Sequence, residues 1–164
     1  MNKTPQSQYK IRFNDRDMFG HLNNARYLDY FINAREDHVK EHYGLDLNDY
    51  YSKDMVWLIG SHEIVYVKPA LYNEIVTIQS TLLRVEHDYL HVETIMTDAK
   101  QSHLKAVMRT RLIPVNPKTG KKQPHLDEFL NWAKSIENDT IEHPDDFQAR
   151  VKGLIADFKI KSSS

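Results

Sequence analysis

A chain of 164 residues, with 40% hydrophobic and 27% charged side chains, is long enough to bury the core of one domain. Its formal net charge of −1 excludes the broad basic field that attracts nucleic acid or anionic lipid. The absence of cysteine excludes disulfides, thiolate metal sites and a cysteine nucleophile. No apolar run reaches the roughly 20 residues that span a bilayer, and no apolar secretory signal begins the sequence. We therefore expect a cytoplasmic protein without nucleic-acid or membrane partners.

The first predicted elements are a short strand and a long helix. Alternating residues predict the strand over 9–13, and the polar residues 14–24 that follow are typical of a loop. Apolar side chains at helical spacing then predict a helix over 24–43, which Gly44 ends. Its first turns are apolar on nearly every side, so this helix should lie buried among other elements.

Four further strands and two helices follow. Short polar turns separate the strands, which is typical of an antiparallel meander, and we expect the strands over 56–67, 75–85, 89–97 and 103–114. Helical patterns cover 126–136 and 147–160. The order predicts an α+β fold, in which one helix packs against an antiparallel sheet. We expect residues 1–125 to form this domain and residues 126–164 to form a helical extension packed on it.

The loop over residues 15–24 holds the densest cluster of chemically active side chains. A helix start exposes unpaired backbone N–H groups and the positive end of the helix dipole. Such a site can stabilise the oxyanion of a tetrahedral transition state. Asp17, a few residues upstream, could attack a carbonyl carbon or act as general base for water. The alternative is that Asp15, Asp17, Asn23 and Asn24 only cap and turn the chain.

A longer pattern contains this cluster. The run Asp17-x-x-Gly20-His21-x-Asn23-Asn24-x-x-Tyr27, followed by Ala34-Arg35, resembles the signature of hotdog-fold acyl-CoA thioesterases of the 4-hydroxybenzoyl-CoA thioesterase type. Tyr66-x-x-Pro69-Ala70 and Arg109-x-Arg111 fall where such proteins have a strand-ending proline and a last core strand. The resemblance implies a long central helix wrapped by an antiparallel sheet. It also implies a homodimer or homotetramer with active sites between subunits.

The resemblance also assigns residues to the site. Asp17 matches the catalytic carboxylate, and Asn24 matches the residue whose backbone N–H holds the thioester carbonyl. Gly20 would let the backbone approach the substrate. The other substrate-binding candidates are His21, Asn23 and Tyr27, which match motif positions, and His62, a strand residue that could line a pocket. For His21 and Asn23, bracing of the loop is the alternative role.

These residues predict hydrolysis of an acyl-CoA thioester to free acid and CoA. The resemblance implies no metal and no cofactor, since coenzyme A enters as part of the substrate. Two alternatives remain open: a hotdog hydratase or dehydratase that uses His21 with Asp17, and a non-catalytic acyl-CoA-binding module.

Two other signals carry less weight. His38-Val39-Lys40-Glu41-His42 matches a zinc-protease pattern but lacks a third ligand. Basic residues that could bind CoA phosphates are each expected to be solvated strand or turn residues; they are Lys68, Arg84, Arg109, Arg111, Lys121 and Lys122.

Overall fold

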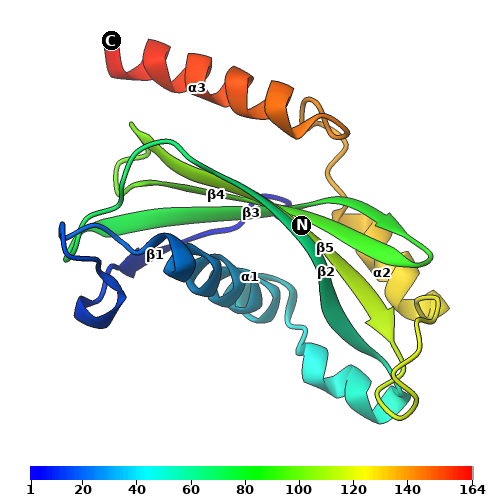
Figure 1. The fold of residues 1–164 in the computed structure, drawn as a ribbon. Helices are drawn as coiled ribbons and strands as arrows, with labels where there is room; N and C mark the ends of the chain where they lie inside the picture. The colour runs from blue at the N-terminus through cyan, green and yellow to red at the C-terminus, as the bar shows by residue number, and fades with distance from the viewer. Residues whose placement is uncertain (164) are drawn as a thin grey trace.

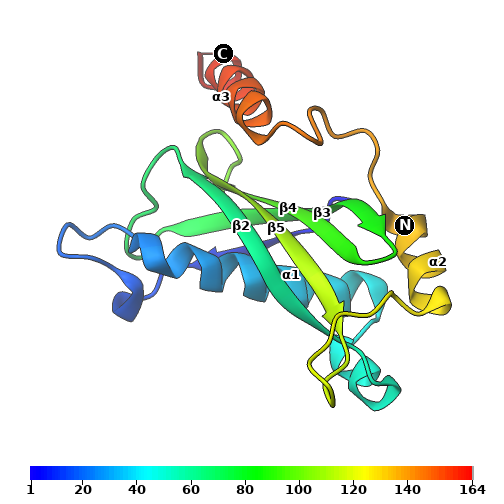
Figure 2. The ribbon, with the colours of Figure 1, turned by 45° about the vertical axis from the view of Figure 1, so that its right-hand side comes forward.

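The computed structural model describes residues 1–163 as a curved antiparallel sheet with helices on both faces (Figure 1). The sheet order is β1-β3-β4-β5-β2, and the strands are β1 (Gln6–Lys10), β2 (Val56–Tyr66), β3 (Ile75–Glu86), β4 (Tyr89–Asp98) and β5 (Leu104–Val115). Helix α1 (Tyr27–Tyr43) lies under one face, and α3 (Phe147–Ser163) crosses the other. Helix α2 (Asp127–Ile136) lies beside the turn between β3 and β4 (Figure 2). The predicted α+β hotdog architecture is confirmed.

The predicted first strand was wrong in position. Strand β1 pairs with β3 from Gln6 opposite Gln79 to Lys10 opposite Ile75, which is where β3 begins. Ile11 still exchanges backbone hydrogen bonds with Asn73 and Glu74 in the turn before β3, and after it the chain leaves the sheet. Phe13, expected in the strand, instead begins a short 3₁₀ turn, Phe13–Asp15. Another 3₁₀ segment, Leu47–Lys53, had no counterpart in the predicted elements.

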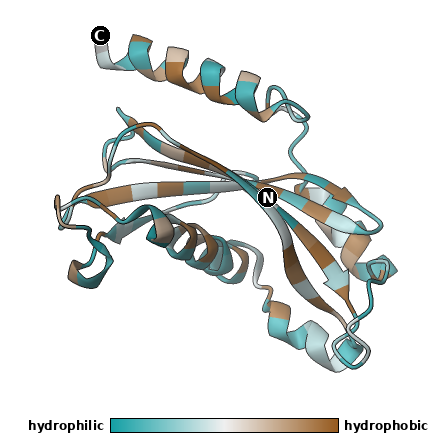
Figure 3. Cartoon of the chain, in the orientation of Figure 1, coloured by the Kyte–Doolittle hydropathy of each residue, from teal (hydrophilic) through white to brown (hydrophobic). Residues whose placement is uncertain are grey.

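Helix α1 forms the main core with the inner face of the sheet, the face turned toward it. Tyr27, Phe31 and Ala34 are buried in one cluster with inner-face residues such as Ile78 and Met108. Apolar and polar residues alternate along the strands, as brown and teal segments show in Figure 3. This period of two places one set of side chains against α1 and the other set on the outer face.

Helix α3 covers part of the outer face. Phe147 and Val151 of α3 are buried in one cluster with Ile95 and Val107 of the sheet. The outer face of a hotdog sheet is therefore not bare in this chain. Among the described residues, no helix has the length and hydropathy that a membrane span requires.

A buried ion network joins this extension to the sheet. Glu93 accepts hydrogen bonds from Arg109 Nε at 3.1 Å and from Arg150 Nη2 of α3 at 3.1 Å. Arg109 also donates to the backbone carbonyls of His143 and Pro144. The expectation that Arg109 is solvated was wrong, because only 2% of it is exposed. Its role is to fix the segment before α3 to the sheet.

Candidate active site

The loop between β1 and α1 folds into a tight hairpin around Asp17. The Asp17 N–H donates to the carbonyl of His21 at 2.7 Å, and the Leu22 N–H donates to the carbonyl of Ala70 at 2.7 Å. Gly20 has φ of +76°, a left-handed conformation that side chains with a Cβ rarely adopt. The loop is thus tied both to itself and to the turn that precedes β3.

Two backbone donors hold the Asp17 carboxylate. Its Oδ1 accepts from the N–H of Phe19 at 2.8 Å and of His21 at 3.0 Å. No described group bonds to the second oxygen, Oδ2, and the side chain is half-buried. One oxygen therefore fixes the orientation, while the other is available to a substrate or a water molecule.

Asn24 lies where the loop enters the helix. It is the first residue of a 3₁₀ turn, Asn24–Arg26, that runs directly into α1. The side chain of Asn23 caps this turn by accepting from the N–H of Ala25 at 2.9 Å. The N–H of Asn24 meets no acceptor among the described residues, and Asn24 is an exposed residue. An unpaired N–H at a helix start is the donor that an oxyanion requires.

The other predicted site residues lie partly in the loop and partly in the core. Gly20, His21 and Asn23 share the loop with Asp17, and the ring of His21 lies 6.3 Å from that of Phe19. Tyr27 is 2% exposed, and its hydroxyl accepts from the N–H of Ala70 at 3.1 Å. The observed contacts of Asn23 and Tyr27 brace the loop, and their contact with substrate stays a prediction.

His62 is not part of this loop. It lies on β2, and its Nδ1 is 2.9 Å from the hydroxyl of Thr110 on β5. Burial lowers the pKa of its imidazole. His62 does not itself line the cavity described below, but it contacts Thr110, which does.

Asp15, the second carboxylate of the motif, has a structural partner. The hydroxyl of Tyr30 on α1 donates to Asp15 Oδ2 at 2.7 Å. Burial raises the pKa of Tyr30 to about 12, and the hydrogen bond to Asp15 adds to the shift. Asp15 thus fixes the loop to the helix through its side chain.

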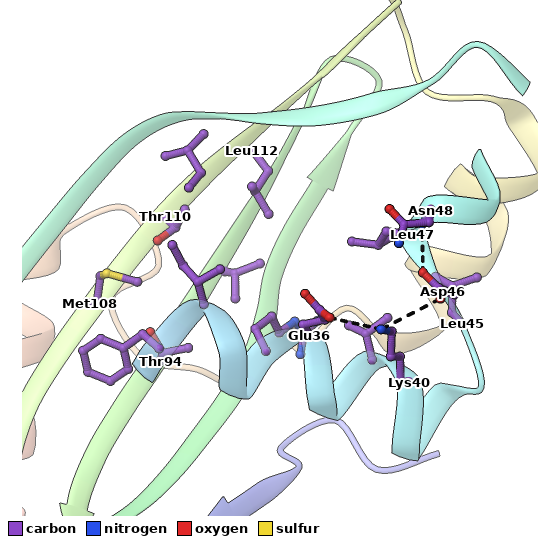
Figure 4. Close-up of a pocket in the computed structure, with 16 residues that line it drawn as sticks. Glu36, Lys40, Leu45, Asp46, Leu47, Asn48, Thr94, Met108, Thr110 and Leu112 are labelled. Atoms are coloured by element: carbon purple, nitrogen blue, oxygen red, sulfur yellow. Dashed lines mark hydrogen bonds and ion pairs between the residues drawn. The ribbon is translucent and has the colours of Figure 1, made fainter. Parts of the chain in front are cut away.

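A cavity of about 170 Å³ lies between part of α1 and the inner face of the sheet (Figure 4). Most of its wall is apolar, including Phe31, Val92, Met108 and Leu112. Its rim carries Lys40, which pairs with Glu36 at 3.0 Å and with Asp46 at 3.8 Å. Asp17 does not line this cavity, which lies along the middle and the C-terminal end of α1. From the sequence, His62 was the one strand residue expected to line a pocket. The cavity itself could not be predicted, because its wall combines residues from distant strands.

Two apolar regions are exposed, one at the hairpin loop and one on the edge strand beside the cavity. At the tip of the hairpin loop, Met18 is 87% exposed and Phe19 is 75% exposed. On the edge strand β2, Leu58 is 55% exposed and Ile59 is 44% exposed. Strand β2 is hydrogen-bonded to β5 on one side only. An unpaired strand edge with apolar side chains is a surface on which a second chain can pair.

The histidine pattern on α1 also has an internal explanation. His38 is fully buried; its Nε2 lies 2.7 Å from the hydroxyl of Ser7, and its Nδ1 lies 2.7 Å from that of Ser80. Both ring nitrogens are thus engaged by the sheet. Within residues 1–163, no three His, Asp or Glu side chains are grouped so that they could hold a metal ion.

Comparisons with known proteins agree with this geometry. Residues 11–151 match the sequence model of the thioesterase-like superfamily. A 1,4-dihydroxy-2-naphthoyl-CoA hydrolase of Rippkaea orientalis is 28% identical over 130 residues, which cover 78% of this chain and 94% of the relative. The long-chain acyl-CoA thioesterase FadM of Escherichia coli is 32% identical over 81 residues, 47% of this chain and 57% of the relative.

The fold has solved counterparts as well. The crystal structure of a DHNA-CoA thioesterase from Staphylococcus aureus superposes with a TM-score of 0.72 at 17% identity, and the alignment covers 94% of each chain. At that identity the similarity shows the fold alone. The sequence match spans the hairpin loop, the helix and the whole sheet beyond β1. The chain therefore belongs to the thioesterase-like superfamily, and the predicted enzyme class, a thioester hydrolase with a hotdog fold, is confirmed at the level of the family.

Proposed function

We propose that the protein hydrolyses acyl-CoA thioesters at the loop between β1 and α1. The observation that carries the proposal is the Asp17 carboxylate, which two backbone N–H groups fix by one oxygen while the other stays available. The two curated relatives, whose names describe a CoA hydrolase and an acyl-CoA thioesterase, support coenzyme A as the leaving group. The proposed reaction needs no metal and no cofactor from the protein.

Asp17 can act in two ways that share one oxyanion site. As general base, it takes a proton from water while the water oxygen bonds to the thioester carbonyl carbon. As nucleophile, its carboxylate forms an acyl anhydride, which water then opens. In both routes the carbonyl oxygen becomes negative beside the Asn24 N–H and the start of α1. In the general-base route the carbon–sulfur bond then breaks, and the sulfur takes the proton that Asp17 removed from water. In the nucleophilic route the carbon–sulfur bond breaks as the anhydride forms, and the thiolate takes a proton released when water opens the anhydride. The products of both routes are the free acid and CoA.

We propose that the active site is completed by a second copy of the chain. Tyr66, at the end of β2, donates to the carbonyl of Asn24 at 2.9 Å, so the end of β2 lies beside the start of α1. The start of β2 follows the end of α1 through residues 44–55. The two elements therefore run in opposite directions.

Two-fold pairing of the β2 edges would place the start of one β2 beside the end of the other. The loop with Asp17 in one subunit would then face the cavity along the end of α1 in the partner. This arrangement supports an acyl chain that is held by one subunit and cleaved by the other. It also covers Leu58 and Ile59, which are exposed in the single chain.

The test is thiol release from a panel of short, long and aromatic acyl-CoAs. The proposal expects turnover with at least one of them, and the preferred acyl group identifies the substrate class. Hydration of an enoyl-CoA without thiol release would favour the hydratase alternative, with His21 as the partner of Asp17. Thermal stabilisation by acyl-CoA without any turnover would favour a binding module and would contradict the proposed hydrolysis.

A further inference from the structure

Polar side chains cross the otherwise apolar inner face of the sheet in one continuous band. Ser80 of β3 lies opposite Thr94 of β4, and Thr110 of β5 lies opposite His62 of β2. Thr94 and Thr110 are diagonal neighbours, since Thr94 pairs with Met108 and Val92 pairs with Thr110. We call Ser80, Thr94, Thr110 and His62 the inner-face polar band. Thr94 and Thr110 line the cavity under α1 (Figure 4).

One hydroxyl of the band has no partner. Thr94 is 2% exposed, and among the described residues its Oγ1 makes no hydrogen bond. The other hydroxyls are engaged: Thr110 bonds to His62, and Ser80 bonds to His38. A buried hydroxyl without a partner destabilises the fold, because folding removes it from water without replacing the lost hydrogen bond. An unpaired hydroxyl in the wall of a cavity indicates that its hydrogen-bond partner is a polar group of the ligand.

A cation lies at the same place without a carboxylate. Arg35 on α1 lines the cavity and donates from Nη1 to the hydroxyl of Ser80 at 3.0 Å. Ser80 lies opposite Thr94 on the neighbouring strand. Its guanidinium lies 5.8 Å from the ring of Tyr43, and burial lowers its pKa. No carboxylate of the described residues lies within 4.0 Å of it. The two cavity-wall carboxylates, Glu36 and Asp46, pair with Lys40 instead.

We propose that the acyl group of the substrate carries a second oxygen, remote from the thioester, that binds to the Thr94 hydroxyl and the Arg35 guanidinium. Arg35 favours an anionic oxygen, so a carboxylate should bind more tightly than a hydroxyl. A guanidinium offers five donors, of which one contacts Ser80 and another the hydroxyl of Tyr43, so donors remain for a ligand. The inference rests on the proposed hydrolysis and adds the chemical class of the acyl group.

The experiment compares three CoA thioesters of equal chain length that end in a methyl, a hydroxyl or a carboxylate group. It is repeated with short, medium and long chains, and thiol release gives kcat/KM for each. We expect kcat/KM to rise from methyl to hydroxyl to carboxylate, by about tenfold or more overall, because the unpaired polar groups of the site penalise the methyl end. If the methyl thioester reacts as well as the others at every chain length, the inference is wrong and the thioesterase assignment stands. If no thioester releases thiol, the proposed function itself fails.

Two variants locate the effect. Thr94→Val removes the hydroxyl and keeps the shape, so it should abolish the preference for hydroxyl over methyl. It should also raise the melting temperature, since no intramolecular hydrogen bond is lost. Arg35→Gln should abolish the preference for carboxylate over hydroxyl.

The matched control is Thr97→Val, on the same strand but with its hydroxyl bonded to the backbone carbonyl of Asp98. It should leave all ratios unchanged. Unchanged ratios in Thr94→Val would overturn the inference, and this test remains decisive if Arg35→Gln does not fold.

Discussion

Asn24 combines two properties that suit a backbone donor in catalysis. Its N–H has no acceptor within the described chain, and the preceding residue, Asn23, has φ −61° and ψ 132°. That extended conformation is the one required of a residue before proline. Proline is also tolerated at the first position of a helical turn, where the N–H is unpaired in any case.

Asn24→Pro is therefore a selective test of the proposed oxyanion site. It removes the N–H without breaking a hydrogen bond of the fold, so the melting temperature should change little. We expect kcat to fall about 10²- to 10³-fold, the usual effect of losing one oxyanion donor. Asn24→Ala keeps the N–H and is the matched control, with activity near that of the parent. Equal activity in the proline and alanine variants would exclude the Asn24 N–H as the oxyanion donor.

At the residue scale, the motif predicted the hairpin loop and the sequence could not predict the cavity. Asp17, Gly20 and Asn24 are close in the chain, so their proximity follows from local turn chemistry. Thr94 and Arg35 line the same cavity only because α1 packs against the inner face of the sheet. Nothing in the neighbourhood of either residue in the sequence distinguishes it from an ordinary strand threonine or a helix arginine.

At the scale of elements, His38 joins α1 to two strands. Its ring nitrogens bond to Ser7 of β1 and Ser80 of β3, each at 2.7 Å. Burial lowers the pKa of His38 to about 4, and the neighbouring Arg35 adds to the shift. The unfolded chain, with a pKa near 6.5 for histidine, binds this proton more readily than the native state does.

Stability should therefore fall as the pH drops from about 6.5 toward 4, because protonation favours the unfolded chain over that window. One proton changes the unfolding constant by at most about tenfold per pH unit. Urea unfolding at a series of pH values measures the effect. In His38→Gln this part of the pH dependence should disappear, although the variant will be less stable than the parent at neutral pH. An identical slope in parent and variant would show that His38 does not titrate in this way.

Helices and strands could be told apart because the spacing of apolar residues is clear in the sequence. Where each element ends depended on contacts with other parts of the chain. Strand β1 ends at Lys10 opposite Ile75, where β3 begins, and Ile11 beyond it bonds to Asn73 and Glu74 of the turn before β3. The 3₁₀ turn Leu47–Lys53 forms where Asp46 accepts from the N–H of Asn48 at 2.9 Å, a local cap without apolar periodicity. Arg109 looked like a solvated strand residue because its partners come from distant parts of the chain: Glu93 from another strand, and the backbone carbonyls of His143 and Pro144 from the segment before α3.

At the scale of the whole molecule, the proposed active site needs the β2 edges of two copies to pair. Ile59 is the test position, since it is 44% exposed on this edge and also lines the cavity under α1. Ile59→Lys places a charge in the proposed interface, and edge charges oppose strand pairing. We expect a monomer in sedimentation and a loss of thiol release in the same variant.

Ile160→Lys is the matched control, because Ile160 is 70% exposed on α3 and is not a residue of the β2 edge. It should leave both the oligomeric state and the activity unchanged. A parent protein that is monomeric and active, or a monomeric Ile59→Lys variant with full activity, would contradict the composite site.

The central claim, that Asp17 carries out thioester hydrolysis, is tested most directly by thiol release from the best acyl-CoA with the parent and Asp17→Asn. Asparagine keeps an oxygen that can accept from the N–H groups of Phe19 and His21, so the loop and the melting temperature should be preserved. It removes the charge that attacks the carbonyl or deprotonates water. The account predicts a fall in kcat of about 10²- to 10⁴-fold. Undiminished turnover in a folded Asp17→Asn protein would show that another group performs the reaction.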